Sequence, residues 1–336
     1  MTLESVFKLD RSKFDGSSIP PQTLSFNERL MDSTAKNPNL FFDVDAARFR
    51  QMIHEGQTSI PKPVLLARAE TFHIPSRDDN RHISCRILRP QSGVAINGVF
   101  MHLHLGGWVI GDEKCQDPVL QKIADANNLL CLSVGYRRAS EDPFPAAPND
   151  CFDVAEWLVD NAKSTFGADL AFVGGESAGA HLSVLVAVHL LRSPTYAGFK
   201  LRGLLLHFGV YDLSGLPQFY NFNPSRPLLI EREGMQAQIS AFCPGLSANE
   251  LKNPGISPLY ADLGGLELPP ALFTVGTQDL LLDDTLFMGL KWLTAGGEAI
   301  VKVYPGASHA YLGFPEHLYP GTRDVFEDIR LFCAAK

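Results

Sequence analysis

The sequence lacks the features that mark secreted, metal-binding and membrane-spanning chains. It has six cysteines, and no two of them have the C-x-x-C spacing of a zinc or redox site. Residues 1–20 contain no apolar stretch typical of a secretory signal peptide. The longest apolar run, around residues 182–191, is too short to span a bilayer. We therefore expect a cytoplasmic protein with no stable membrane association, no metal site and no cofactor.

Positive charge is also scarce. The 336 residues include 29 Lys and Arg against 37 Asp and Glu, which gives a formal net charge of −8. Nucleic-acid binding relies on clustered cations, so we expect no nucleic-acid partner. The hydrophobic share of 45% excludes a disordered chain, and a chain of this length can bury about 75% of the surface that it exposes when unfolded.

From residue 66 onward, runs rich in β-formers alternate with helical patterns. Strands alternating with helices predict an α/β fold, with a mostly parallel sheet of eight strands that is covered on both faces. The first strands are joined by short connections, so that edge should be antiparallel. The expected strands lie near 66–74, 82–88, 97–103, 129–136, 169–174, 202–209, 270–276 and 299–304, and the expected helices near 115–128, 147–165, 178–193, 283–296 and 321–333.

Two segments do not follow this alternation. Residues 1–62 carry short helical pieces between proline breaks, and residues 213–262 are rich in Pro, Asn and aromatic residues. Both could fold over the carboxyl ends of the strands. We therefore expect a catalytic body formed by 63–212 and 263–336, with 1–62 as an N-terminal cap segment and 213–262 as a helical cap insertion.

The strongest chemical signal is G-x-S-x-G at residues 175–179. An apolar strand precedes it and a long apolar helix follows at once, which is the context of a nucleophile elbow. Gly175 and Gly179 are expected there because a Cβ at either position would clash where strand and helix meet. The turn would force Ser177 into a strained conformation and present its hydroxyl as a nucleophile.

A glycine pair follows an earlier strand, at Gly106 and Gly107. Acyl transfer needs backbone N–H donors at the place where a carbonyl oxygen becomes negative. The two glycines can turn their amides toward one point without side-chain interference. The amide of Ala178, directly after the nucleophile, would supply a third donor. These three residues are the predicted oxyanion hole.

These blocks resemble those of a known family. His104-Leu105-Gly106-Gly107-Trp108, the elbow 175–179 and the stretch 136–147 resemble the H-G-G-G, G-D-S-A-G and Y-R-x-A-P-E-x-x-F-P-A patterns of hormone-sensitive-lipase-like carboxylesterases. The resemblance implies an α/β-hydrolase fold and makes His104 structural. It also implies a possible homodimer, since this family often pairs through an edge strand.

Three positions depart from the family's patterns. Leu105 replaces the first glycine of H-G-G-G, Glu176 replaces the usual aspartate beside the serine, and Ser140 replaces a proline. By analogy the donors come from the second and third glycines, so the oxyanion hole can survive. Glu176 keeps the charge and lengthens the arm.

A serine nucleophile needs a base that is held by a third group. In this fold the chain order is Ser, then Asp or Glu, then His. Asp279 is the first acid after the strand near 270–276, and residues 279–283 resemble the family's D-P-L-x-D motif. His309 follows the last strand. Ser177, Asp279 and His309 are therefore the predicted catalytic triad.

The expected reaction is hydrolysis of esters of small, fairly hydrophobic molecules with short-to-medium acyl or acetyl groups. Trp108 beside the oxyanion loop and Phe219, Tyr220 and Phe222 of the insertion are candidates for the substrate pocket, although the aromatic residues of the insertion could equally pack the cap onto the body. Alternatives with the same triad are an acyltransferase, a carbon–carbon hydrolase and a peptidase. A non-catalytic ligand receptor is a further alternative, which the presence of His309 disfavours.

Overall fold

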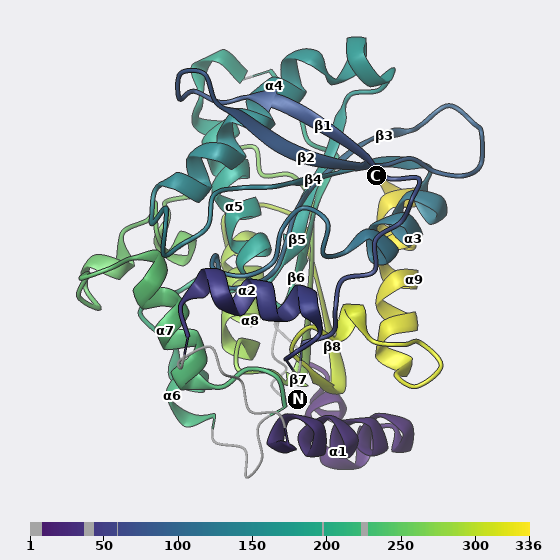
Figure 1. Ribbon diagram of the computed structural model, residues 1–336, viewed down its shortest axis with the longest axis vertical. Helices are drawn as coiled ribbons and strands as arrows, with labels where there is room; N and C mark the ends of the chain where they lie inside the picture. The colour runs from purple at the N-terminus through teal and green to yellow at the C-terminus, as the bar shows by residue number, and fades with distance from the viewer. Residues whose placement is uncertain (1–8, 37–43, 59, 197, 223–227) are drawn as a thin grey trace, which may run out of the picture.

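The structure is a computed structural model that describes residues 9–36, 44–58, 60–196, 198–222 and 228–336. Its centre is a sheet of eight strands in the order β1-β2-β4-β3-β5-β6-β7-β8. Figure 1 shows this twisted sheet running through the body. The strands are β1 Glu70–Pro75, β2 His82–Leu88, β3 Gly98–Leu103, β4 Leu129–Val134, β5 Leu170–Glu176, β6 Gly203–His207, β7 Ala271–Gln278 and β8 Ala299–Ser308.

Pairing in the sheet is mostly parallel, as predicted. β2 runs antiparallel to both of its neighbours, β1 and β4. Every other pair is parallel, from β4–β3 to β7–β8. The carboxyl ends of the strands from β4 to β8 therefore meet at one edge of the sheet, which is where catalytic loops of open α/β sheets gather.

Helices cover both faces of the sheet (Figure 1). Helices α3 and α9 pack on one face, with Phe100, Phe172 and Leu205 beneath them. Helices α4, α5 and α8 pack on the other face. The bounds of the helices are α1 Pro21–Lys36, α2 Ala46–Glu55, α3 Asp117–Asn127, α4 Ala146–Phe166, α5 Ala178–Arg192, α6 Pro217–Asn221, α7 Arg232–Phe242, α8 Leu282–Thr294 and α9 Pro320–Ala335.

Several strand limits differ from the sequence expectation by two to four residues, among them those of β1, β5 and β8. β1 begins only at Glu70, because the N–H of Leu66 donates to Asp117 Oδ2 instead of joining the sheet. β5 continues to Glu176, directly before the predicted nucleophile. β8 continues to Ser308 and passes through Pro305, which is tolerated because β8 is an edge strand.

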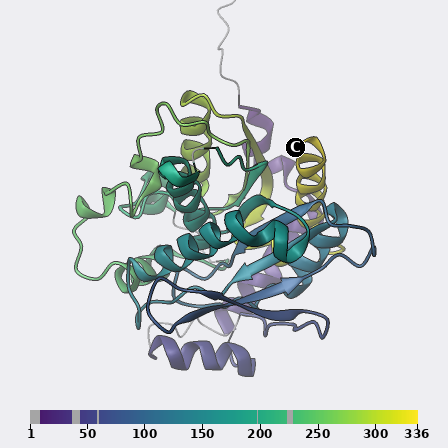
Figure 2. The ribbon, with the colours of Figure 1, turned by 90° about the horizontal axis from the view of Figure 1, so that it is seen from above.

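The two segments outside the alternation contact the carboxyl ends of the strands or the loops that follow them. In the N-terminal segment, Asn27 of α1 donates to the carbonyl oxygen of Gly306 at 2.8 Å, and Arg50 of α2 donates to that of Val109 at 2.8 Å. In the insertion, the Phe242 ring of α7 stacks on a ring of the body. Figure 2 shows the green insertion on the side of the molecule away from the yellow α9.

All six cysteines carry free thiols; five are buried and Cys115 is partly buried. Burial raises the pKa of the Cys243 thiol to about 12, so it behaves as a neutral apolar group. Among the described residues, no helix combines the length and the apolar character that a membrane span requires.

Candidate active site

The strand β5 and the helix α5 meet at Ser177. This residue has φ 54° and ψ −117°, a strained conformation for any residue with a side chain. A Cβ on Gly175 would lie 2.0 Å from the carbonyl oxygen of Leu103, and one on Gly179 would lie 1.8 Å from it. Both glycines are therefore needed for this close approach. The sequence predicted a clash between the strand and the helix of the elbow, whereas the nearest atom to both added Cβ positions belongs to Leu103, at the end of β3.

Two side chains from the following strand ends reach Ser177 in series. His309 comes directly after β8, and its Nε2 lies 3.0 Å from Ser177 Oγ. Its Nδ1 lies 2.9 Å from Oδ2 and 3.1 Å from Oδ1 of Asp279, which follows β7. Asp279 is fully buried, and its Oδ1 also accepts the N–H of Leu281 at 2.9 Å. This fixed, buried carboxylate orients the imidazole toward the serine.

The loop of residues 104–112, the oxyanion loop, turns sharply beside the serine. Gly106 has φ 126° and Gly107 has φ 57°, conformations that favour glycine. Among the residues that the structure describes, neither glycine uses its N–H in a hydrogen bond. Ala178 is the first residue of α5, so its N–H has no acceptor one turn earlier in the helix. All three predicted donors are thus available to a ligand.

His104 holds the oxyanion loop from behind. Its Nδ1 donates to the carbonyl oxygen of Leu105 at 2.8 Å, and its ring stacks on that of Tyr136 with centroids 4.0 Å apart. The Tyr136 hydroxyl donates to the carbonyl oxygen of His104 at 2.8 Å. Burial lowers the pKa of His104 to about 4, so the ring is neutral at physiological pH. These contacts agree with the structural role that the resemblance implies.

The structure corrects the expectation for Trp108. This side chain is fully buried, stacked on Phe242 at 4.5 Å, and its Nε1 donates to His181 Nδ1 at 3.1 Å. It joins the insertion to the body and has no surface for a substrate. The pattern could not reveal this, because the Phe242 that covers it comes from a distant part of the chain.

The three aromatic candidates of the insertion lie in different surroundings. Phe219 is 6% exposed and packs into the core, and the half-buried Phe222 packs against the same core cluster. Tyr220 is 55% exposed, and its hydroxyl donates to the carbonyl oxygen of Ser214. Phe219 and Tyr220 contact each other edge to face. For Phe219, packing of the insertion onto the body accounts for the burial.

Sequence reasoning missed a polar side chain that lies against the oxyanion loop. A Cβ on Gly107 would lie 2.0 Å from Gln238 Oε1, so the Gln238 carboxamide of α7 packs directly on this glycine. In the described part of the chain, this carboxamide makes no hydrogen bond. No motif surrounds Gln238 in the sequence, so only the folded arrangement identifies it.

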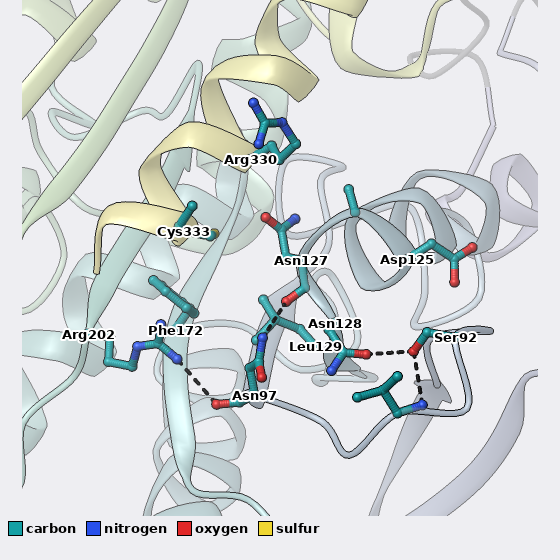
Figure 3. Close-up of a pocket in the computed structure, with 13 residues that line it drawn as sticks. Ser92, Asn97, Asp125, Asn127, Asn128, Leu129, Phe172, Arg202, Arg330 and Cys333 are labelled. Atoms are coloured by element: carbon teal, nitrogen blue, oxygen red, sulfur yellow. Dashed lines mark hydrogen bonds between the residues drawn. The ribbon is translucent and has the colours of Figure 1, made fainter.

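A cavity of about 560 Å³ lies elsewhere in the molecule (Figure 3). It is lined by the segments that precede β3 and β4, and by α9. These strands are parallel to β5, so the cavity lies at the opposite edge of the sheet from Ser177. Arg202 beside it donates to the carbonyl oxygen of Asn97 at 3.2 Å. The second arginine of the cavity, Arg330, is paired with Glu327, and neither cation points to a specific ligand.

Comparisons with known proteins identify related chains. The sequence model of the α/β hydrolase fold family matches residues 100–313. Carboxylesterase NlhH of Mycobacterium tuberculosis is 31% identical over 220 residues, which cover 64% of this chain and 67% of the relative. An esterase of Acinetobacter venetianus is 27% identical over 242 residues, which cover 70% of this chain and 75% of the relative.

Solved structures share the fold. An esterase of Pyrobaculum calidifontis superposes with a TM-score of 0.77 at 23% identity, covering 94% of this chain and 98% of its own. The carboxylesterase EstE1, cloned from a metagenomic library, gives a TM-score of 0.73 at 24% identity, covering 88% of this chain and 97% of its own. The names of these relatives do not favour an acyltransferase, a carbon–carbon hydrolase or a receptor.

Proposed function

Because this chain belongs to the α/β-hydrolase fold family, we propose that Ser177, His309 and Asp279 are its catalytic triad. The chain is a hydrolase of the carboxylesterase type and resembles the hormone-sensitive-lipase-like esterases. The observation that carries the assignment of residues is the continuous series of hydrogen bonds from Asp279 through His309 to Ser177.

In the first half of the reaction, His309 Nε2 takes the proton of Ser177 Oγ as that oxygen attacks the ester carbonyl carbon. The carbonyl oxygen becomes an oxyanion, which accepts hydrogen bonds from the N–H groups of Gly106, Gly107 and Ala178. When the intermediate collapses, the carbon–oxygen bond to the alcohol breaks. His309 gives its proton to the departing alcohol, and the acyl group remains on Ser177.

The second half repeats these steps with water. His309 takes a proton from water as the water oxygen attacks the acyl carbon, and the same N–H groups stabilise the second oxyanion. Collapse breaks the bond to Ser177 Oγ, which recovers its proton from His309, and the carboxylic acid leaves. Asp279 stays ionised throughout and stabilises the imidazolium that forms in each half.

The substrates that we propose are esters of small, fairly hydrophobic molecules with short-to-medium acyl groups. Residues 1–62 and 213–262 would act as the cap, since α1, α2 and α7 all contact the carboxyl ends of the strands or the loops that follow them. Gln238 and Phe222 are the residues of the insertion that we assign to the pocket wall, together with the exposed Tyr220.

A fluorophosphonate probe tests the triad directly. The wild-type protein should be labelled at one site, and Ser177→Ala should abolish both labelling and hydrolysis of p-nitrophenyl esters. His309→Ala should reduce kcat by about 10⁶-fold, and Asp279→Asn should reduce it by about 10⁴-fold. Full ester hydrolysis by a folded Ser177→Ala protein would refute the assignment. Activity that rises steadily from acetyl to long-chain p-nitrophenyl esters would refute the preference for short acyl groups.

We also propose a homodimer that pairs through β8. This strand ends the sheet, and Ile300 on it and Phe287 and Leu290 on the adjacent α8 are exposed apolar side chains. Light scattering after gel filtration should give twice the mass of 36.9 kDa, and Ile300→Lys should give the monomer mass. A wild-type monomer at micromolar concentration would refute this proposal.

A cytoplasmic location is the last part of the proposal. It is supported by the six free thiols, which a reducing compartment preserves. Cell fractionation with an antibody against the native chain would test it, and recovery in an extracellular or organellar fraction would refute it.

A further inference from the structure

A buried polar network lies behind the serine, on the face of the sheet that α3 and α9 cover. Glu176 directly precedes Ser177 and is 1% exposed. Its Oε2 lies 2.9 Å from Nε2 of His102, which is fully buried on β3. His102 Nδ1 lies 2.9 Å from Oγ of Ser133 on β4. The proposed mechanism uses none of these side chains.

The Glu176 side chain is a carboxylate in this network. Burial opposes its ionisation, but attraction to His102 and hydrogen bonds from His102 and Gln116 hold the pKa of this carboxyl below its usual value. A carboxylate can only accept, so His102 donates to Glu176 through Nε2. Such charge-assisted bonds in a dry interior are stronger than neutral ones and hold their partners closely.

The second arm of the network reaches the oxyanion loop. Gln116, which precedes α3, is buried close enough to Glu176 to help lower the pKa of its carboxyl, and Gln116 Oε1 accepts the N–H of Leu105 at 3.4 Å. Leu105 stands one residue before Gly106. The carboxylate beside the nucleophile is thus connected to the backbone that carries the oxyanion donors.

This connection joins two of the three positions where the motifs depart from the family's usual pattern. Leu105 replaces a glycine and Glu176 replaces an aspartate. A glutamate reaches one methylene further than an aspartate, and here its carboxylate meets both the His102 ring and the Gln116 side chain. Leu105 lies at the far end of the same chain of contacts.

We propose that Glu176 is a positioning residue that, through His102 and Gln116, holds the oxyanion loop at a fixed distance from Ser177. The inference rests on the proposed triad and oxyanion hole. A donor that moves by part of an ångström still lets substrate bind but stabilises the transition state less well. Loss of the network should therefore lower kcat and leave KM nearly unchanged.

The test compares Glu176→Gln and Gln116→Leu with the wild type. Each variant should lose about 10- to 100-fold in kcat with little change in KM. Gln116→Leu leaves the contact between Glu176 and His102 in place, so it serves even where Glu176→Gln does not fold. A trifluoromethyl ketone, which adds reversibly to a serine and places its oxygen in the oxyanion hole, should bind each variant more weakly by a similar factor.

Asp153→Asn is the matched control. Asp153 is a buried carboxylate on α4 that pairs with Arg77 at 2.6 Å and lies outside the site. This variant should lower the melting temperature and leave kcat and ketone affinity unchanged. Unchanged kcat in folded Gln116→Leu, or the same loss of kcat in Asp153→Asn, would overturn the inference. Fluorophosphonate labelling distinguishes failure of this inference from failure of the triad assignment. If the triad assignment holds, labelling is lost in Ser177→Ala and kept in Glu176→Gln, Gln116→Leu and Asp153→Asn.

Discussion

The carbonyl oxygen of Leu103 lies 1.8 Å from the position that a Cβ on Gly179 would occupy. Leu103 is the last residue of β3, and Gly179 is the second residue of α5. This contact brings the oxyanion loop, which follows β3, against the helix that begins after Ser177. The glycine of the elbow therefore sets the distance between the nucleophile and the oxyanion donors.

Gly179→Ala should consequently impair both folding and activity. The added methyl group meets backbone atoms, which cannot turn aside as a flexible side chain can, and overpacking of this kind costs about 1–3 kcal/mol. Thermal unfolding should show a lower melting temperature, and fluorophosphonate labelling should slow. Gly198→Ala is the control, because no atom lies within 4 Å of its added Cβ. Equal melting temperatures for the two variants would contradict the argument.

The strain at Ser177 predicts a substitution that raises stability, in contrast to Gly179→Ala. Its φ of 54° and ψ of −117° cost about 1–3 kcal/mol for a residue with a Cβ, and glycine avoids this cost. Ser177→Gly should therefore abolish hydrolysis and yet raise the free energy of unfolding. The gain should be only about 1 kcal/mol, because the greater freedom of glycine in the unfolded chain offsets part of the relief of strain.

Urea unfolding of the two inactive variants separates strain from the loss of the hydroxyl. Ser177→Ala also removes the hydroxyl but keeps a Cβ, so it should be less stable than Ser177→Gly. If Ser177→Gly proves less stable than Ser177→Ala, the backbone of the elbow is not strained in solution.

The sequence predicted those parts of the site that depend on local patterns. The elbow at Ser177 and the glycine pair of the oxyanion loop follow from a few adjacent residues, and the structure places them side by side. The contacts that the sequence could not predict join distant positions. Glu176 and His102 are 74 positions apart, and Trp108 and His181 are 73 apart. Such pairs depend on strand order and helix packing, which no single motif encodes.

Burial of Asp284 at the start of α8 should make stability depend on pH. Asp284 is 2% exposed, and its Oδ1 accepts the N–H groups of Tyr211 and Asp212 at 2.6 and 2.9 Å, where the insertion leaves the body. Burial raises the pKa of this carboxyl from 3.8 to about 8. Between these two values the folded state binds more protons than the unfolded state, so stability falls as the pH rises.

Asp284→Asn should remove this part of the pH dependence. The free energy of unfolding of the wild type should fall between pH 4 and pH 8 more steeply than that of the variant, by at most about 1.4 kcal/mol per pH unit. Urea titrations across this range measure both slopes. Asp169→Asn, at an exposed carboxylate that precedes β5, is the control and should keep the wild-type slope. Parallel slopes for wild type and Asp284→Asn would show that Asp284 ionises normally.

The contact between Gln238 and Gly107 predicts how the enzyme selects its acyl group. Gly107 is a proposed oxyanion donor, so a carboxamide that packs on its Cα lies within about 8 Å of the substrate carbonyl oxygen. Within the described ranges the half-buried Gln238 carboxamide has no hydrogen-bond partner, so it is available to hydrogen-bond a hydroxyl or carbonyl group on the acyl chain. The wild type should therefore prefer p-nitrophenyl 3-hydroxybutyrate to p-nitrophenyl butyrate in kcat/KM.

Gln238→Leu keeps the bulk of the side chain and removes its hydrogen-bonding groups. The preference for the hydroxylated ester should fall about 5- to 10-fold, which corresponds to one hydrogen bond of about 1–1.5 kcal/mol. Gln236→Leu changes an exposed glutamine on the same helix and should leave the ratio of the two kcat/KM values unchanged. A ratio that stays constant in Gln238→Leu would mean that this carboxamide only fills space above Gly107. A ratio that shifts equally in both variants would assign the effect to the surface of α7 and not to the contact with the oxyanion loop.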